Sequence, residues 1–315
     1  MNFAPVGRRG FLAGAGAAAL AAGLPGAALA RTAYDPKARY ELTVSEVEYR
    51  RTPQGRSLLA RIYQPAGAGP FPVVIDLHGG GWNAKDRTAE QPFDRAIAEA
   101  GALLIAVDMT RAPEAPYPAC VVDANYAVRW VKARAAAWKG DVSAPLGVFA
   151  SSSGGHVAEL LVMRPRDPRY AAVPLPENPR LDATVDYLVL RSPVSDVFAR
   201  YENAVAMKNA SMIKNNTTFF VPFDTIHESN PREILERREN APLKPMLVMQ
   251  GALDDNVRPA AQTRFVETYR AAGGKVDFTI FEGCEHEWIA TPGPQTDRAH
   301  EMAKAFIARQ VNGQA

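Results

Sequence analysis

The sequence predicts an α/β fold in which a mainly parallel, eight-stranded sheet is flanked by helices. Short apolar runs, bounded by glycine, proline or charged residues, alternate with stretches that have helical periodicity, which is typical of stacked β-α units. Several runs are apolar at nearly every position, as strands buried on both faces are. The expected strands are residues 40–49, 58–63, 72–77, 102–107, 146–149, 187–190, 246–249 and 276–280.

Turn residues and helical spacing supply the remaining elements. Pro53, Gln54 and Gly55 separate the first two strands, which we therefore expect to form an antiparallel hairpin. Residues 195–242 separate two strands by far more than the usual short connection, so we predict a small helical cap inserted into a domain of residues 31–315. The other expected helices are residues 90–100, 118–138, 155–163, 259–272 and 296–310.

The first 30 residues have the pattern of a cleaved export signal. Arg8 and Arg9 precede a weakly apolar Ala/Gly run, and Ala28 and Ala30, on either side of Leu29, offer a small-residue cleavage site. The run is shorter and richer in glycine than the roughly 20 apolar residues that a membrane-spanning helix needs. The arginine pair indicates twin-arginine export, so we expect a periplasmic or extracellular protein.

Charge and cysteine content limit the possible partners. Loss of residues 1–30 removes two arginines and leaves 34 basic and 34 acidic residues. A balanced charge argues against a nucleic-acid or anionic-membrane partner, which would require a basic patch.

Cys120 and Cys284 have no metal-ligand spacing. They can pair outside the cytoplasm, but we favour two buried free thiols; the oligomeric state is left open.

The segment VFASSSGGH, residues 148–156, follows an expected strand and opens an expected helix, which is the position of a nucleophile elbow. An elbow holds its nucleophile in a strained turn, so the residues two before and two after it must be small. Ser152 has Ala150 and Gly154 at these positions, whereas Ser151 and Ser153 have a bulkier residue at one or both. Ser152 is therefore the candidate nucleophile, although a serine-rich helix cap is the alternative for this motif alone.

The motif HGGGW, residues 78–82, directly follows the strand that ends at Leu77. An oxyanion-hole loop is expected after the third strand of such a sheet, and glycines let backbone N–H groups face a ligand. We therefore predict that the N–H groups of Gly80, Gly81 and Ser153 stabilise a developing oxyanion. One such donor contributes about 3 kcal/mol in the transition state. The alternative is a glycine-rich turn, which its place beside His78 and Trp82 disfavours.

A general base must come from the five histidines. Only His286 lies in a loop directly after the last expected strand, where this kind of fold places its base. The acid should follow the preceding strand, and the loop at residues 251–257 carries Asp254 and Asp255. The other histidines lie in the oxyanion loop, the elbow helix, the insertion and a later helix: His78, His156, His227 and His300.

On these motifs the chain resembles bacterial carboxylesterases of the α/β-hydrolase superfamily with an HGGGW loop, near the hormone-sensitive-lipase-like and feruloyl-esterase-like branches. The resemblance covers most of the chain after residue 30, including DMTRAPEAPYPA at residues 108–119 and GALDDNV at residues 251–257. It implies the α/β-hydrolase fold and ester hydrolysis, and it assigns the acid to Asp254 over Asp255. The chain departs from the family pattern at five positions: Met109, Thr110, Ala150, Ser151 and Ser153.

The leading hypothesis is ester hydrolysis through an acyl-enzyme on Ser152, with His286 as base and Asp254 as its orienting acid. This chemistry requires no metal or organic cofactor, and the sequence has no His-Glu-x-x-His motif. Two other classes are weighed: an amide or formamide hydrolase with the same triad, including an arylformamidase-like or peptidase activity, and a non-catalytic binding protein on the same scaffold.

Aromatic residues of the insertion bear on the substrate. Phe219, Phe220 and Phe223, with Trp82 of the oxyanion loop, are candidates for an apolar wall over Ser152. The alternative is that the phenylalanines form only the core of the cap, and the sequence leaves both open. A modest cap favours small ligands, so we expect short-chain or aryl esters.

Overall fold

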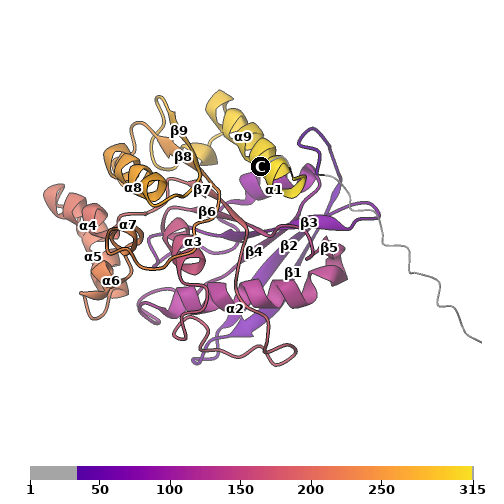
Figure 1. Cartoon of the computed structure of the whole chain (residues 1–315), viewed down its shortest axis with the longest axis horizontal. Helices are drawn as coiled ribbons and strands as arrows, with labels where there is room; N and C mark the ends of the chain where they lie inside the picture. Colours follow the sequence, from indigo (N-terminus) through magenta and orange to yellow (C-terminus); the bar gives the residue numbers. More distant parts are fainter. Residues whose placement is uncertain (1–33, 314–315) are drawn as a thin grey trace, which may run out of the picture. The chain divides into compact units, whose positions relative to one another are not determined.

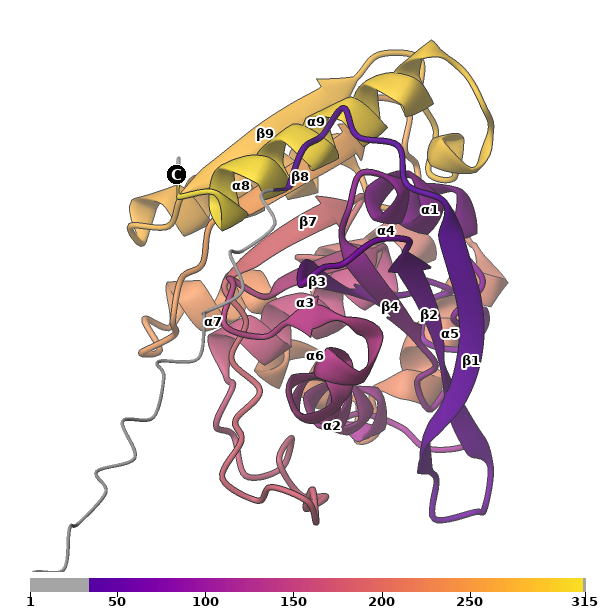
Figure 2. The same ribbon diagram turned by 90° about the vertical axis from the view of Figure 1, so that its right-hand side faces the viewer.

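The computed structural model describes residues 34–313, so the predicted signal peptide at residues 1–30 and its cleavage site lie outside the described residues. In the described part, one sheet runs through the middle and helices cover both of its faces (Figures 1 and 2). The strands are β1 (Leu42–Arg51), β2 (Ser57–Pro65), β3 (Phe71–Leu77), β4 (Leu103–Val107), β5 (Gly140–Asp141), β6 (Gly147–Ser151), β7 (Tyr187–Arg191), β8 (Met246–Gly251) and β9 (Val276–Phe281).

The sheet has the strand order β1-β2-β4-β3-β6-β7-β8-β9, and β5 pairs with β3. The hairpin of β1 and β2 is antiparallel, as is the pairing of β2 with β4, and the strands from β4 to β9 are parallel. The predicted fold class is thus confirmed. The two-residue strand β5 was not predicted, because a Gly-Asp pair carries no strand signal of its own.

Burial on both faces explains the continuous apolar runs of the central strands. Every residue of β3, β4, β6, β7 and β8 is buried. Successive side chains point to opposite faces, so that Ile75 and Val74 belong to two different core clusters. Helices α2 (Ala119–Arg134), α3 (Ser153–Met163) and α8 (Pro259–Ala271) contribute to the first cluster, and α1 (Gln91–Glu99) and α9 (Pro294–Val311) to the second.

The two cysteines lie in these separate clusters. Cys120 packs in the first cluster and Cys284 in the second, and both are buried free thiols. Since the sheet lies between them, this arrangement agrees with the interpretation favoured from the sequence.

The long interval between β7 and β8 contains four helices, which gather at one side of the molecule in Figure 1. Asparagine or aspartate caps three of them, because the side chains of Asp196, Asn209 and Asn230 accept bonds from backbone N–H groups of the first turn. The predicted helical cap is therefore present. Its helices are α4 (Val197–Ala206), α5 (Ala210–Phe219), α6 (Thr225–Glu228) and α7 (Pro231–Glu236).

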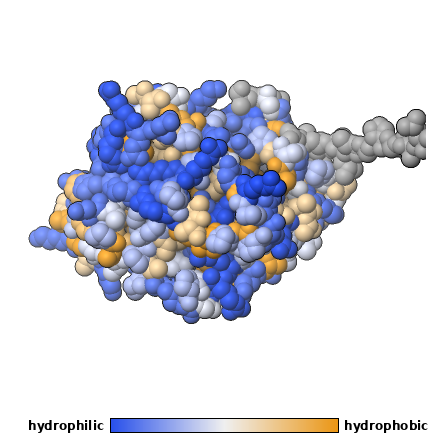
Figure 3. Space-filling view, turned by 60° about the horizontal axis from the view of Figure 1, so that its bottom comes forward, coloured by the Kyte–Doolittle hydropathy of each residue, from blue (hydrophilic) through white to orange (hydrophobic). Residues whose placement is uncertain are grey.

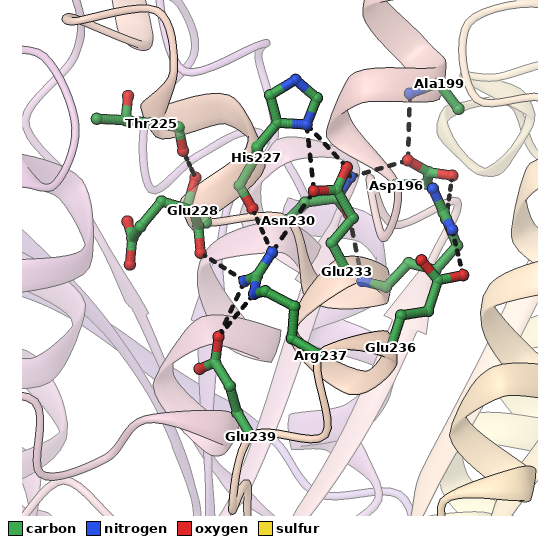
Figure 4. A network of polar contacts seen from close by, with 12 residues as sticks. Asp196, Ala199, Thr225, His227, Glu228, Asn230, Glu233, Glu236, Arg237 and Glu239 are labelled. Atoms are coloured by element: carbon green, nitrogen blue, oxygen red, sulfur yellow. Dashed lines mark hydrogen bonds and ion pairs between the residues drawn. The ribbon is translucent and has the colours of Figure 1, made fainter.

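A polar network joins α4 to α6 and α7 (Figure 4). Asp196, at the start of α4, accepts hydrogen bonds from Asn230 Nδ2 at 3.0 Å and from Arg232 Nε at 2.6 Å. Glu233 of α7 accepts from Asn230 Nδ2 at 2.9 Å and lies 3.0 Å from His227 Nδ1. The position of α4 is thus set by bonds to the α6–α7 region.

The face in Figure 3 is mostly hydrophilic, with small separate hydrophobic areas. Among residues 34–313, none of the helices is both long and apolar enough to cross a membrane.

Candidate active site

The turn between β6 and α3 holds Ser152 in a strained backbone conformation, with φ 49° and ψ −119°. Few non-glycine residues adopt positive φ, and such strain is concentrated at functional sites. Close packing keeps the turn tight, since a Cβ added to Gly154 would lie 2.0 Å from the carbonyl oxygen of Leu77. Helix α3 begins at Ser153, two residues before the predicted start, because the turn ends at Ser152.

Three residues from distant parts of the chain meet at this turn. Ser152 Oγ lies 2.9 Å from His286 Nε2, and His286 Nδ1 lies 2.7 Å from Asp254 Oδ2. These distances form a continuous hydrogen-bonded chain from the hydroxyl to the carboxylate. All three residues are at most 8% exposed. The arrangement can transfer a proton from the hydroxyl to the imidazole and stabilise the imidazolium that results.

The loop after β8 holds the Asp254 carboxylate in place. Its Oδ1 accepts the backbone N–H groups of Asn256 at 3.0 Å and Val257 at 2.7 Å, and its Oδ2 also accepts from Gln250 Nε2 at 2.9 Å. Burial raises the pKa of the Asp254 carboxyl. The hydrogen bond and charge of His286, together with the Val257 N–H, lower the pKa by more than burial raises it, so the pKa lies below its usual value. Asp255, by contrast, is exposed.

The three consecutive serines have three different partners. Ser151 Oγ donates to Glu90, Ser152 Oγ contacts His286, and Ser153 Oγ accepts the backbone N–H of Trp82 at 3.2 Å. Of the three serines, only Ser152 therefore contacts a histidine. Ser153 instead connects the elbow to the oxyanion loop.

The glycines of the oxyanion loop adopt left-handed backbone conformations, with φ 107° at Gly80 and 60° at Gly81. A Cβ at Gly80 would lie 2.1 Å from the carbonyl oxygen of Ala84, so no other residue fits there. Within the described residues, the backbone N–H groups of Gly80 and Gly81 have no backbone acceptor. Together with the N–H of Ser153, in the unpaired first turn of α3, they are available to a ligand oxygen.

A buried ion pair that the sequence motifs did not reveal supports the histidine loop. Arg191, at the end of β7, donates from Nη1 to the backbone oxygen of His286 at 2.7 Å and from Nη2 to Glu90 Oε1 at 3.0 Å. Glu90 also accepts the Ser151 hydroxyl. Arg191 and Glu90 are 1% and 4% exposed. The only signal in the sequence is that both charged residues lie beside apolar runs. This signal is weak, because charged residues are usually exposed and their position in the sequence does not predict burial.

Trp82 connects the oxyanion loop to the cap. Its ring stacks on Phe219 with centroids 4.8 Å apart, contacts Phe220 edge-on at 5.3 Å, and its Nε1 donates to His156 Nδ1 at 3.2 Å. The other His156 nitrogen bonds the backbone oxygen of Ser229 at 2.9 Å. Burial lowers the pKa of His156 to about 4, so the ring is neutral at pH 7.

This packing decides between the two interpretations of the cap phenylalanines. Phe219 and Phe220 are 0% and 1% exposed and belong to the core, so they fix the cap to Trp82 rather than form a wall open to a ligand. Phe223 is half-buried and packs against Tyr201 with centroids 4.9 Å apart. Of the predicted pocket residues Trp82, Phe219, Phe220 and Phe223, the three phenylalanines therefore belong to the core or pack against it, which was the alternative that the sequence left open. Trp82 also borders a small cavity.

A small cavity adjoins the oxyanion loop. It is bordered by Gly79, Trp82, Met109 and Ser153, among others, and its volume of about 10 Å³ has room for about one water molecule. In the described part of the chain, no group of three or more His, Cys, Asp or Glu side chains is arranged to hold a metal ion.

Comparison with known proteins agrees with this geometry. The BD-FAE family model matches residues 61–269. Carboxylesterase NlhH of Mycobacterium tuberculosis is 38% identical over 109 residues, which are 34% of each chain. Carboxylic ester hydrolase LipN of the same species is 33% identical over 238 residues, 73% of this chain and 60% of LipN. The chain thus covers less than two thirds of the length of either relative.

Solved esterase structures share the fold. Propionate-bound esterase Est2 of Thermogutta terrifontis has a TM-score of 0.64 at 22% identity, covering 86% of this chain and 94% of that one. Esterase LipW of Mycobacterium marinum has a TM-score of 0.66 at 23% identity, covering 85% and 82%.

Proposed function

Because the chain belongs to the BD-FAE family of α/β-hydrolases, we propose that it is a serine carboxylesterase that forms an acyl-enzyme on Ser152. The observation that carries the proposal is the hydrogen-bonded chain from Ser152 through His286 to Asp254, next to a loop with unused N–H donors. The relatives named carboxylesterase or carboxylic ester hydrolase support the same reaction.

In the proposed mechanism each of these residues has one part. Ser152 Oγ attacks the ester carbonyl while His286 Nε2 takes its proton, and the N–H groups of Gly80, Gly81 and Ser153 bind the resulting oxyanion. When the intermediate collapses, His286 gives that proton to the departing alkoxide. Water then attacks the acyl-enzyme with His286 again as base, and the carboxylic acid and free Ser152 are released. Asp254 stabilises the imidazolium in both halves.

The proposed substrates are short-chain or aryl esters. The burial of Phe219 and Phe220 supports short acyl groups, since a long chain needs a continuous apolar space and these two rings offer it no open wall. The alcohol part is not specified by these features.

A panel of 4-nitrophenyl esters of rising acyl length, run beside an anilide and a formamide, tests both parts of the proposal. We expect the highest kcat/KM for acetate to butyrate and none of this turnover in Ser152→Ala. Fastest turnover of long acyl chains would contradict the substrate range. Preference for the anilide or formamide, or full activity of a folded Ser152→Ala variant, would contradict the esterase assignment.

We further propose that the enzyme is exported through the twin-arginine route, since Arg8, Arg9 and the following Ala/Gly run support such a signal. We expect the enzyme to act on a small ester outside the cytoplasm and to have no nucleic-acid partner.

A further inference from the structure

A cleft with a volume of about 440 Å³ lies between α4 of the cap and the first turns of α8, together with the two residues before it. This volume is in the range of sites for small molecules. Arg200 and Asn203 line it from α4, and Val257 and Gln262 from the opposite side. Because the Val257 N–H also bonds the Asp254 carboxylate, the cleft adjoins the loop of the proposed catalytic acid.

Three side chains of this cleft have buried polar atoms without a hydrogen-bond partner among the described residues: Arg200 Nη1, Asn203 Oδ1 and Gln262 Oε1. A second polar atom of each side chain does make a hydrogen bond, which holds the side chain in place. Arg200 Nε donates to Asn256 Oδ1 at 2.8 Å, Asn203 Nδ2 to the Asp255 backbone oxygen at 2.7 Å, and Gln262 Nε2 to Ser195 Oγ at 3.1 Å. Unpartnered buried polar atoms are uncommon in folded proteins, and the lining of this cleft brings together three side chains that each have one, namely one donor and two acceptors.

Arg200 makes the site selective for charge. It is 5% exposed, and no carboxylate of the described chain forms an ion pair with it. Burial lowers the pKa of Arg200 to about 10, and only the Asp254 carboxylate opposes this effect. The exposed Arg258 and Arg264 also line the cleft.

The acids of the cleft do not neutralise this charge. Asp196 is already bonded to Arg232 at 2.6 Å, and Glu202 is the other acid of the lining. The lining thus has three arginines and two carboxylates, one of which is already paired with Arg232. The net charge of the cleft is therefore positive. An anion is therefore favoured there over a cation.

The guanidinium contacts both loops that flank Ser152. It lies over the Trp82 ring, 5.4 Å from its centroid, and Trp82 directly follows the oxyanion glycines. On the other side it bonds Asn256, whose backbone N–H holds Asp254. A substrate with its ester at Ser152 therefore has a cationic side chain next to both walls of the site.

We propose that this cleft is a substrate subsite in which Arg200 binds a free carboxylate of the ester, with Asn203 and Gln262 accepting hydrogen bonds from donors on the same molecule. The inference rests on the proposed esterase function and narrows its substrates to esters that carry a second, anionic group. A guanidinium matches a carboxylate through two parallel hydrogen bonds, which a neutral amide cannot reproduce.

The test compares two esters of nearly equal size, 4-acetoxybenzoate and 4-acetoxybenzamide, which differ in the negative charge. We expect the wild-type kcat/KM to favour the carboxylate by about tenfold, the ratio that one charge-assisted hydrogen bond supports. In Arg200→Met the ratio should fall to near one, and Arg200→Lys should retain part of it. Arg166→Met, which removes a charge from a side chain that is 83% exposed, is the matched control and should keep the wild-type ratio.

A wild-type ratio of one or less overturns the inference by itself. A folded Arg200→Met enzyme overturns it as well if it keeps the preference for the carboxylate ester or loses activity equally toward both esters. Phenyl acetate separates the two levels of the argument. Turnover of phenyl acetate without preference for the carboxylate ester overturns the subsite alone. Absence of phenyl acetate turnover overturns the esterase function and the subsite together.

Discussion

Arg191 donates a hydrogen bond of 2.7 Å from Nη1 to the backbone carbonyl oxygen of His286, the residue whose ring contacts Ser152. The guanidinium is itself held by Glu90, and both side chains are buried. The imidazole is thus positioned from two sides, by Asp254 at Nδ1 and by Arg191 at the main chain.

Replacement of Arg191 by Met should lower kcat by at least about tenfold, because a shift of the His286 loop lengthens the path of the proton. The same change leaves Glu90 without its buried partner, at a cost of about 3–5 kcal/mol in the free energy of unfolding. Arg191→Lys should recover part of kcat, measured beside circular dichroism to select folded enzyme. A folded Arg191→Met variant with wild-type kcat would show that the contact does not position the base.

The two adjacent aspartates of the acid loop should differ sharply. Asp254→Asn removes the charge that stabilises the imidazolium and should lower kcat by about 10³- to 10⁴-fold. Asp255 is exposed, and its side chain is not in the hydrogen-bonded chain, so Asp255→Asn should stay within about threefold of wild type. Steady-state kinetics on a short-chain ester decide the matter, and equal losses in both variants would refute the assignment to Asp254.

Glu159 of α3 should make stability decrease as the pH rises. Burial raises its pKa to about 8, against the hydrogen bond from Ser195 Oγ at 2.6 Å. Its stabilising contribution is complete below the unfolded pKa of about 4.3 and is lost progressively up to the folded value. Glu159→Gln should therefore gain stability relative to wild type across that window, by up to about 5 kcal/mol at pH 9.

Denaturant unfolding at pH 5, 7 and 9 measures this difference. Glu267 of α8 is exposed, so Glu267→Gln is the matched control and should show no such trend, because water solvates its carboxylate in both states. A pH-independent difference between wild type and Glu159→Gln would mean that Glu159 is ionised in the folded protein.

Export should leave a mature N-terminus at or near Arg31. Intact-mass spectrometry of protein from the native host measures it, and changing Arg8 and Arg9 to Lys should block transport. A retained Met1 in a cytoplasmic fraction would disprove the proposal.

The sequence was sufficient for the features that depend on local patterns. The apolar runs gave the strands β3 to β9 except β5, and the elbow and HGGGW motifs lie at the ends of β6 and β3. Such features are encoded within about ten residues, because strand periodicity, turn residues and glycine-dependent backbone angles act locally. The same local patterns select Ser152 and His286 as candidates, since each occupies a fixed place after a strand.

Tertiary packing decided the features that join distant segments. Arg191 meets His286 across 95 positions of the chain and Glu90 across 101, Phe219 stacks on Trp82 instead of lining an open pocket, and Arg200 enters a cleft next to Asp254. Composition and spacing cannot specify these contacts, because a buried charge and a surface charge have the same letters in the sequence. Only the packing of helices and loops against the sheet determines which polar groups lose water and which partners replace it.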